Sequence, residues 1–173
     1  MTIGPFIMIR ISPFVTSLLF LLMPCWATTA PLLFAQGDEA TLYSRPSNQQ
    51  MLDFLRKAGG QHVRLEQEGA ARSTLTAQFQ RYHLAVVNDH ADGNLQLSVE
   101  FENRSPISRE MLDRANAWNR DRRYSEVYLD ENENWVIESD FDCESGVTEA
   151  NIIAVIEQFI TMTEQFDHFL NEL

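Results

Sequence analysis

The stretch NRDRRYSEVYLDENENWVIESDF, residues 119–141, places a polar centre between two runs of alternating residues. The runs SEVYLD and WVIESDF alternate polar and apolar side chains, which is the period of a β-strand with one face in solvent. Asp and Asn in the central DENEN favour turns, because they tolerate left-handed backbone conformations. The stretch therefore predicts a β-hairpin with its turn at residues 130–134.

A calcium-binding loop is the alternative for this turn. Such a loop needs oxygen ligands at positions 1, 3 and 5, a glycine at position 6 and a glutamate at position 12. Asp130, Asn132 and Asn134 fit the first three positions. Trp135 then stands at the glycine position and Phe141 at the glutamate position. The match fails at both discriminating positions, so the sequence favours the hairpin.

Four segments upstream have the character of strands. The clearest is NLQLSVEFE (94–102), whose apolar residues alternate with polar ones. The others are STLTAQF (73–79), RYHLAVV (81–87) and a weaker HVRLEQ (62–67). Such alternation predicts antiparallel strands with one face in solvent.

Two helices are predicted around these strands. Ser47 and Gln50 have the spacing of a capping box at the start of the first helix, and Gly59 ends it. Ser108 caps the second helix, in SREMLDRANAWN (108–119).

A third helix starts at Thr148 and carries an apolar stripe that continues to Leu170. Ile153 and Met162 lie off this stripe, which indicates either deeper burial or a partner surface. The elements together predict an α+β fold in the order α-β(3–4)-α-β-β-α. In this fold an antiparallel sheet has helices packed on one face.

The N-terminal region has the features of a secretory signal peptide. Arg10 precedes the apolar run ISPFVTSLLFLLM (11–23), and small residues follow it. The run is short for a membrane span, although an uncleaved anchor is the alternative. We expect a signal peptide over residues 1–35, cut after Ala35 or at Ala27, and a periplasmic or secreted protein. A flexible segment at 36–46 and a domain at 47–173 complete the expected organisation.

The net charge of the chain limits which classes of partner it can bind. It holds 13 basic and 25 acidic residues, for a net charge of −12. Such a protein repels phosphate backbones, so nucleic acid is not an expected partner. A membrane is expected to be contacted only through an uncleaved signal segment.

Cys143 is the single cysteine outside the signal segment, and it lies between Asp142 and Glu144. These negative neighbours are expected to raise the pKa of the thiol. No internal disulfide can form, and the role of the thiol stays open.

Three arginines follow the second helix: Arg120, Arg122 and Arg123. Cations complement the negative end of a helix dipole, and Asp121 or Glu126 can pair with them. This structural role is favoured, and binding of an anion or a partner peptide is the alternative.

Sequence signatures of an enzyme are missing: there is no GxSxG, HExxH, P-loop or GxGxxG motif. His90 with Asp89 and Asp92 could hold a metal, but NDHADGN (88–94) is also typical of a hairpin turn, which is favoured. We therefore expect no catalytic residues, no cofactor and no metal.

The region from residue 116 to 152 resembles the C-terminal signature of the YbjN-domain family. The residues that carry the resemblance are Asn116, Trp118, Asn119, Arg123, Tyr128, Leu129, Asp130, Gly146, Val147 and Thr148. The resemblance implies a fold similar to type III secretion chaperones. It also implies a regulator of sensory transduction without an established enzymatic activity. Secreted members often have a cysteine pair near the mid-sheet loop, where this chain has NDHADGN.

The motif residues are expected to do structural work. Asn116 and Asn119 can satisfy carbonyl groups at a helix end, Trp118 can anchor that end to the sheet, and Gly146 allows a tight turn before the cap at Thr148. The favoured function is a non-catalytic, chaperone-like or regulatory module that binds another protein, with a homodimer left open. The alternative is a small-ligand binder or an enzyme with a pocket between sheet and helices.

Overall fold

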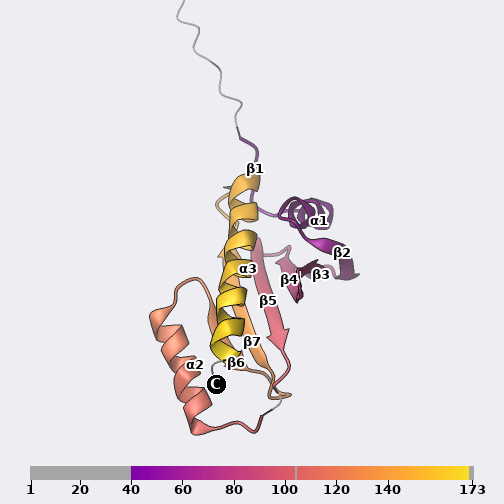
Figure 1. The fold of residues 1–173 in the computed structure, drawn as a ribbon. Coiled ribbons are helices and arrows are strands. Elements are labelled where there is room, and N and C mark those ends of the chain that lie inside the picture. The colour runs from indigo at the N-terminus through magenta and orange to yellow at the C-terminus, as the bar shows by residue number, and fades with distance from the viewer. Residues whose placement is uncertain (1–39, 104, 172–173) are drawn as a thin grey trace, which may run out of the picture. The chain divides into compact units, whose positions relative to one another are not determined.

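The computed structural model describes residues 40–103 and 105–171 of the chain. Its helices and strands are shown in Figure 1. In chain order the elements are β1 (Leu42–Tyr43), α1 (Asn48–Lys57), β2 (Gln61–Gln67), β3 (Arg72–Phe79), β4 (Tyr82–Asp89), β5 (Asn94–Phe101), α2 (Arg109–Asp121), β6 (Glu126–Leu129), β7 (Trp135–Asp142), β8 (Val147–Thr148) and α3 (Glu149–Asn171).

Strands β2 to β7 form one six-stranded antiparallel sheet in the order β2-β3-β4-β5-β7-β6. Hairpins join β2 to β3, β3 to β4, β4 to β5 and β6 to β7. Helix α2 connects β5 to β6. Strand β7 pairs with β5 on one side and with β6 on the other. This arrangement confirms the predicted α+β class and the predicted order of elements.

The predicted hairpin at residues 130–134 is confirmed. The carboxylate of Asp130 accepts hydrogen bonds from the backbone N–H groups of Asn132 at 2.9 Å and Asn134 at 2.8 Å. Glu133 adopts a left-handed backbone with φ of 64°, and the Asp130 N–H donates to the Asn134 carbonyl at 2.9 Å. The acidic side chain thus organises the turn from within, as its residue types predict.

One face of the sheet packs against the helices. Its inward residues pair across the strands, as in Leu84 opposite Val99 and Val99 opposite Ile137. They form one buried cluster with residues of α1, α2 and α3, so the helices cover the same face. Phe166 of α3 lies at its centre, with ring centroids 5.2 Å from Trp118 and 6.1 Å from Trp135. Burial of each such side chain stabilises the fold by about 1.5–3 kcal/mol.

The helices begin where the sequence predicts. Ser47 and Gln50 form a reciprocal capping box at α1, and the Ser108 side chain accepts from the Met111 N–H at α2. The Thr148 hydroxyl accepts from the Asn151 N–H at 3.2 Å, which caps α3. Each cap satisfies a backbone donor that a helix otherwise leaves without a partner.

A second, two-stranded sheet pairs β1 with β8. It differs from the flexible segment predicted over residues 36–46, because Leu42 and Tyr43 form a strand there. The ring of Tyr43 packs edge-on against Phe54 with 5.1 Å between centroids, and Asn88 donates to the Pro46 carbonyl at 2.9 Å. These contacts join residues distant in sequence, so no local pattern indicates them.

The predicted signal peptide, its cleavage site and the alternative membrane anchor lie outside the described residues. Among the helices that the structure does describe, none has both the length and the apolar character needed to cross a bilayer.

Candidate protein-binding surface

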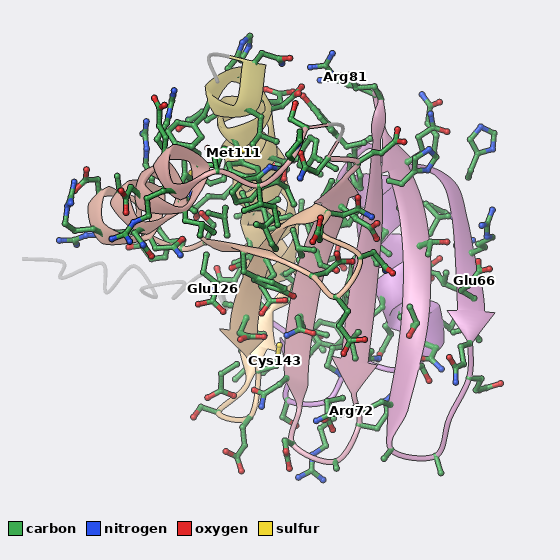
Figure 2. The ribbon with its side chains drawn as sticks, turned by 90° about the horizontal axis from the view of Figure 1, so that it is seen from below. Glu66, Arg72, Arg81, Met111, Glu126 and Cys143 are labelled. Carbon is green, nitrogen blue, oxygen red and sulfur yellow. The ribbon has the colours of Figure 1, made fainter. Side chains whose placement is uncertain are left out.

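The second face of the sheet carries no helix, and its acidic side chains gather on one half. Figure 2 places Glu66 on β2 at one edge of the sheet and Glu126 on β6 at the other. Outward positions of β5, β6 and β7 bring together a set that we call the acidic face: Glu100, Glu126, Glu138, Asp140 and Asp142. Glu126 lies directly opposite Glu138, with Ser98 beside Glu138 on the next strand.

Burial and neighbouring carboxylates both affect the ionisation of Glu138 on the acidic face. The pKa of Glu138 is raised, first by partial burial and then by the charges of Asp140 and Glu126, although a hydrogen bond from Tyr128 opposes the rise. That hydrogen bond, from the Tyr128 hydroxyl to Glu138 Oε2, measures 2.8 Å. Burial and the bond to Glu138 raise the pKa of Tyr128 to about 12. The acidic face therefore lacks a compensating cation among the described residues.

The three predicted arginines lie together after α2 but differ in what they contact. Arg120 forms two hydrogen bonds of 2.8 Å to Asp121, which lower the pKa of that carboxyl. The guanidinium of Arg122 stacks over the Trp118 ring at 5.1 Å and donates to Gln165 at 3.3 Å. Arg123 is exposed and has no hydrogen bond or ion pair with another described residue. Their role in partner binding stays a prediction.

The motif residues of α2 hold the helix against β6. Asn119 donates to the Val127 carbonyl at 2.9 Å and accepts from the Val127 N–H at 2.8 Å. Trp118 is 3% exposed and its indole N–H lies 3.4 Å from the Ser125 hydroxyl. Asn116 instead is exposed and has no hydrogen bond to another described residue.

The remaining motif residues lie in β6, two turns and β8. Tyr128 is 42% exposed on the acidic face, and Asp130 organises the hairpin turn. Gly146 has φ of 86°, a conformation that favours glycine, and the side chain of Leu42 packs beside it. Thr148 caps α3. Asp130, Gly146 and Thr148 thus stabilise turns and a helix start, whereas Tyr128 contacts Glu138 on the surface.

The turn at residues 88–94 is a hairpin turn between β4 and β5, as predicted. Asp89 accepts from the N–H groups of Ala91 at 2.9 Å and Asp92 at 3.2 Å, and from Arg72 at 2.7 Å. These bonds, that of Arg72 first, lower the pKa of Asp89. No group of three or more metal-ligating side chains is present within residues 40–103 and 105–171.

His90 contacts a serine that the sequence did not single out. Its ring nitrogen Nε2 lies 3.0 Å from the Ser73 hydroxyl, which also accepts from Asn48 at 3.1 Å. A histidine beside a serine can activate a nucleophile. Ser73 is only 1% exposed, however, so a substrate has no access to it and the pair joins β3 to the β4–β5 turn.

Cys143 is fully buried, and burial followed by the charge of Asp142 raises its pKa to about 11. The direction of this shift agrees with the prediction, but its main cause differs. Cys143 follows the end of β7 and faces the core, which its polar neighbours in sequence did not indicate. The thiol is therefore an inert packing group at neutral pH.

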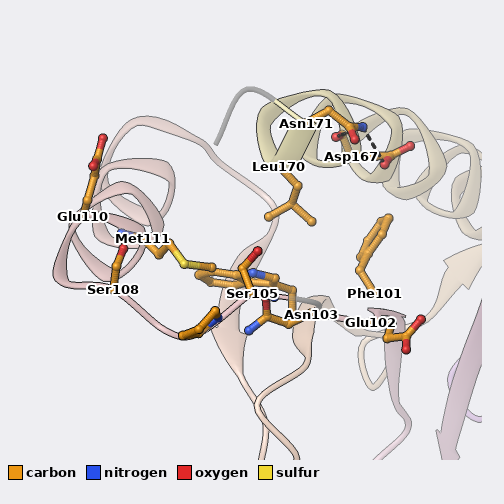
Figure 3. Close-up of a pocket in the computed structure, with 12 residues that line it drawn as sticks. Phe101, Glu102, Asn103, Ser105, Ser108, Glu110, Met111, Asp167, Leu170 and Asn171 are labelled. Atoms are coloured by element: carbon orange, nitrogen blue, oxygen red, sulfur yellow. Dashed lines mark hydrogen bonds between the residues drawn. The ribbon is translucent and has the colours of Figure 1, made fainter.

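A pocket of about 630 Å³ lies at the opposite end of α2, among β5, β7, α2 and the last turn of α3. Figure 3 shows its lining residues. Phe101, Trp135 and Leu170 form the apolar part, and no histidine or arginine is among the described lining residues. The carboxylate of Asp167 is already engaged by the Tyr82 hydroxyl at 2.8 Å and by Arg81.

The fold defines the class of this protein: an α+β domain with helices on one face of an antiparallel sheet. The chain is similar to the crystal structure of YbjN, described as a putative transcription regulator from E. coli, with a TM-score of 0.55 and 17% identity over 72% of this chain and 90% of that chain. A chain of the HopA1-SchA chaperone–effector complex gives a TM-score of 0.48 and 15% identity over 65% and 86%. No curated protein matches the sequence.

Residues 47–172 match the YbjN family, whose description reads "Putative bacterial sensory transduction regulator". The chain belongs to the YbjN family. The resemblance carried by the C-terminal motif is thus confirmed over a longer part of the chain than the motif itself.

Proposed function

We propose that this chain is a non-catalytic protein-binding module that works in the periplasm or after secretion. The observation that carries the proposal is the acidic face, because the carboxylates of Glu138, Asp140 and Asp142 have no paired lysine or arginine among the described residues. The description of the YbjN family as a regulator supports a role through binding rather than chemistry.

The charge of this surface indicates the kind of partner. Concentrated carboxylates repel phosphate and attract a basic surface, and they speed encounter with it at low salt. Burial is the first cause of the raised pKa of Glu138, and the charges of Asp140 and Glu126 add to it. A cationic partner would offset the repulsion among these carboxylates, so binding is expected to weaken as salt concentration rises.

The extracytoplasmic setting rests on the apolar run at residues 11–23 with Arg10 before it and small residues after it. Cell fractionation and mass determination of the mature N-terminus test it. A processed chain outside the cytoplasm, cut after Ala35 or Ala27, supports the proposal. An intact N-terminus in the cytoplasmic fraction contradicts it.

Cross-linked co-purification tests the binding function. Full-length protein is compared with a variant that carries Glu138→Gln, Asp140→Asn and Asp142→Asn. The matched control makes the same change of charge at exposed acids away from this surface, Glu68→Gln, Asp92→Asn and Glu131→Gln. A partner that the first variant loses and the control retains supports the proposal. A partner retained by both contradicts a role for the acidic face.

Binding of a small ligand is the second candidate, and the pocket beside Trp135 favours it. Its volume of about 630 Å³ lies in the range of ligand sites, and Phe101 and Leu170 add apolar surface. A screen of small molecules by thermal shift tests this candidate. Met111→Trp, which fills the pocket from α2, should abolish any shift that arises there.

A further inference from the structure

Strand β7 continues beyond the end of its neighbour β6. β6 pairs only with the first half of β7, since Glu126 lies opposite Glu138 and no pair follows. Residues 139–142 pair with β5 on one side, and no described strand lies on the other. The sheet therefore ends in a step, where half of β7 is an edge to which no described strand is paired.

The backbone polarity along this edge follows from two hydrogen bonds. The backbone N–H and C=O of Val127 point to Asn119, away from β7. The backbone groups of the preceding residue, Glu126, therefore point toward β7, and those of its partner Glu138 point back toward β6. On the opposite side, the Cys143 N–H donates to the Gly93 carbonyl at 3.0 Å. Because alternate residues point to opposite sides, the backbone N–H and C=O groups of Asp140 and Asp142 face the open step.

The other edge of the sheet is built differently. β2 has two register irregularities against β3, a left-handed residue at His62 and an exposed ion pair between Arg64 and Glu66. Bulges and charged side chains protect an edge from pairing with another strand. The open half of β7 pairs with β5 in unbroken register from Trp135 to Asp142 and has no bulge. Its charges, on Asp140 and Asp142, are of one sign and would repel an acidic strand but attract a basic one.

Side chains make a groove beside this edge. Tyr124, which is 69% exposed, borders a hollow lined by Phe141 and Val155 on the helix side, and a second one lined by Ser139 and Asp140. We call this surface the β7 edge groove: Tyr124, Ser139, Asp140, Phe141 and Val155, which line the hollows, and Asp142, which follows them on the same edge. Its two sides differ, with apolar residues toward α3 and carboxylates toward the acidic face.

We propose that the β7 edge groove binds an extended segment of another protein as an added strand, in which basic and apolar residues alternate. The proposal rests on the proposed function and names where and how the partner binds. In an added strand, successive side chains point to opposite faces. One set would meet Asp140 and Asp142, and the other would meet Phe141 and Val155.

Charge complementarity selects this occupant over a second copy of the chain. A copy would bring the same carboxylates to the groove, and each chain already carries a net charge of −12. Like charges placed directly opposite across two strands are destabilising. A lysine or arginine on the added strand would instead neutralise Asp140 or Asp142, while its backbone pairs with theirs.

The test uses a peptide of alternating lysine and valine with blocked ends, Lys-Val-Lys-Val-Lys-Val. It is added to isotope-labelled protein in the form that cells produce, and the backbone amide signals are followed by NMR. Backbone amide signals of Tyr124, Asp140 and Asp142 should shift, and hydrogen exchange at Asp140 and Asp142 should slow. A Glu-Val peptide of the same pattern should shift none of them. Shifts confined to Val63 and Leu65 on β2, or equal shifts with both peptides, would overturn the proposal.

Variants at one position separate charge from backbone pairing. Asp140→Asn keeps the N–H and should weaken binding of the Lys-Val peptide about threefold, as loss of one exposed charge predicts. Asp140→Pro also removes the N–H and should weaken it about fivefold more. If the proline variant does not fold, Asp140→Lys with Asp142→Lys serves instead and should transfer the preference to the Glu-Val peptide. Unchanged affinity in a folded variant contradicts the groove.

Outcomes for the groove and for the proposed function can be told apart. A cellular partner that depends on the acidic face while the peptide leaves the groove signals unchanged would overturn only the added strand. Broadening of the Asp140 and Asp142 signals with protein concentration alone would indicate a second copy as the occupant and overturn the proposal.

Discussion

The side-chain amide of Asn119 makes both hydrogen bonds that a neighbouring strand would make to Val127. The distances are 2.9 Å to the carbonyl and 2.8 Å from the N–H. Asn119 thereby closes the outer edge of β6 and fixes the end of α2 beside it. The same contact orients β6 so that its other side pairs with β7, which ends in the open step at Asp140.

Removal of this contact should destabilise the fold. Asn119→Ala leaves two backbone groups of Val127 without a partner, and we expect the free energy of unfolding to fall by about 1–3 kcal/mol. Asn116→Ala, three residues earlier and exposed, is the matched control and should change it by less than about 0.5 kcal/mol. Urea denaturation of both variants measures the difference. Equal values for the two would contradict the role given to Asn119.

Trp118 should be the most costly single truncation in this region. Its ring packs against Phe166 at 5.2 Å and Phe169 at 5.4 Å, so Trp118→Ala should cost about 3–5 kcal/mol of stability. Arg122→Ala removes the cation above the ring and an exposed hydrogen bond to Gln165, and it should cost about 0.5–1 kcal/mol. Thermal unfolding measures the loss of stability in each variant. A larger loss for Arg122→Ala than for Trp118→Ala would contradict this packing.

The acidic face should make stability depend on pH. The pKa of Glu138 is raised above its ordinary 4.5, so its contribution to stability is present below pH 4.5 and is lost as pH rises through the raised value. Glu138→Gln should therefore be more stable than the parent at pH 7, by up to about 1 kcal/mol, and equal to it at pH 3. A variant that is less stable at pH 7 would show that the Tyr128 hydrogen bond outweighs the combined cost of burial and repulsion.

Asp89 should show the opposite dependence. Its pKa is lowered below the ordinary 3.8, so its contribution is present above pH 3.8 and is lost as pH falls through the lowered value. Asp89→Asn keeps an acceptor for the Ala91 N–H but loses the charge that pairs with Arg72. We expect a lower unfolding temperature than the parent at pH 7 and a shrinking difference in acid. A constant difference would exclude ionisation as the cause.

Cys143 should react only when the protein opens. Its pKa of about 11 and full burial leave almost no accessible thiolate at pH 8. Labelling by a thiol reagent should therefore be slow and should accelerate in urea along the unfolding curve. Fast labelling of the folded protein would contradict the packing of Cys143 in the core.

Strands and hairpins could be predicted because their signals are local. The alternation in residues 94–102 and the turn at 130–134 depend on neighbours along the chain. Helix caps at Ser47, Ser108 and Thr148 have the same property. Each of these features appears in the structure at the predicted residues.

Features that depend on distant contacts could not be predicted. The sequence does not indicate that β6 begins opposite Glu138 and leaves the rest of β7 without a partner strand. That outcome depends on the length of β6 and on its register against β7. The strand at Leu42 needs its partner Thr148, more than a hundred residues away. The sequence also treats Asn116 and Asn119 alike, although only Asn119 lies next to β6 once α2 packs against the sheet.

Contact between the acidic face and a protein partner can be captured by a photo-activatable cross-linker at Ser98, in the middle of the sheet face that carries no helix. The same cross-linker at Gln165, on the helix side, is the control. We predict a cross-linked partner from Ser98 in cells, reduced in the Glu138→Gln, Asp140→Asn, Asp142→Asn background, and none from Gln165. A partner that cross-links from Gln165 and not from Ser98 would show that binding takes place on the helix side and not at the acidic face.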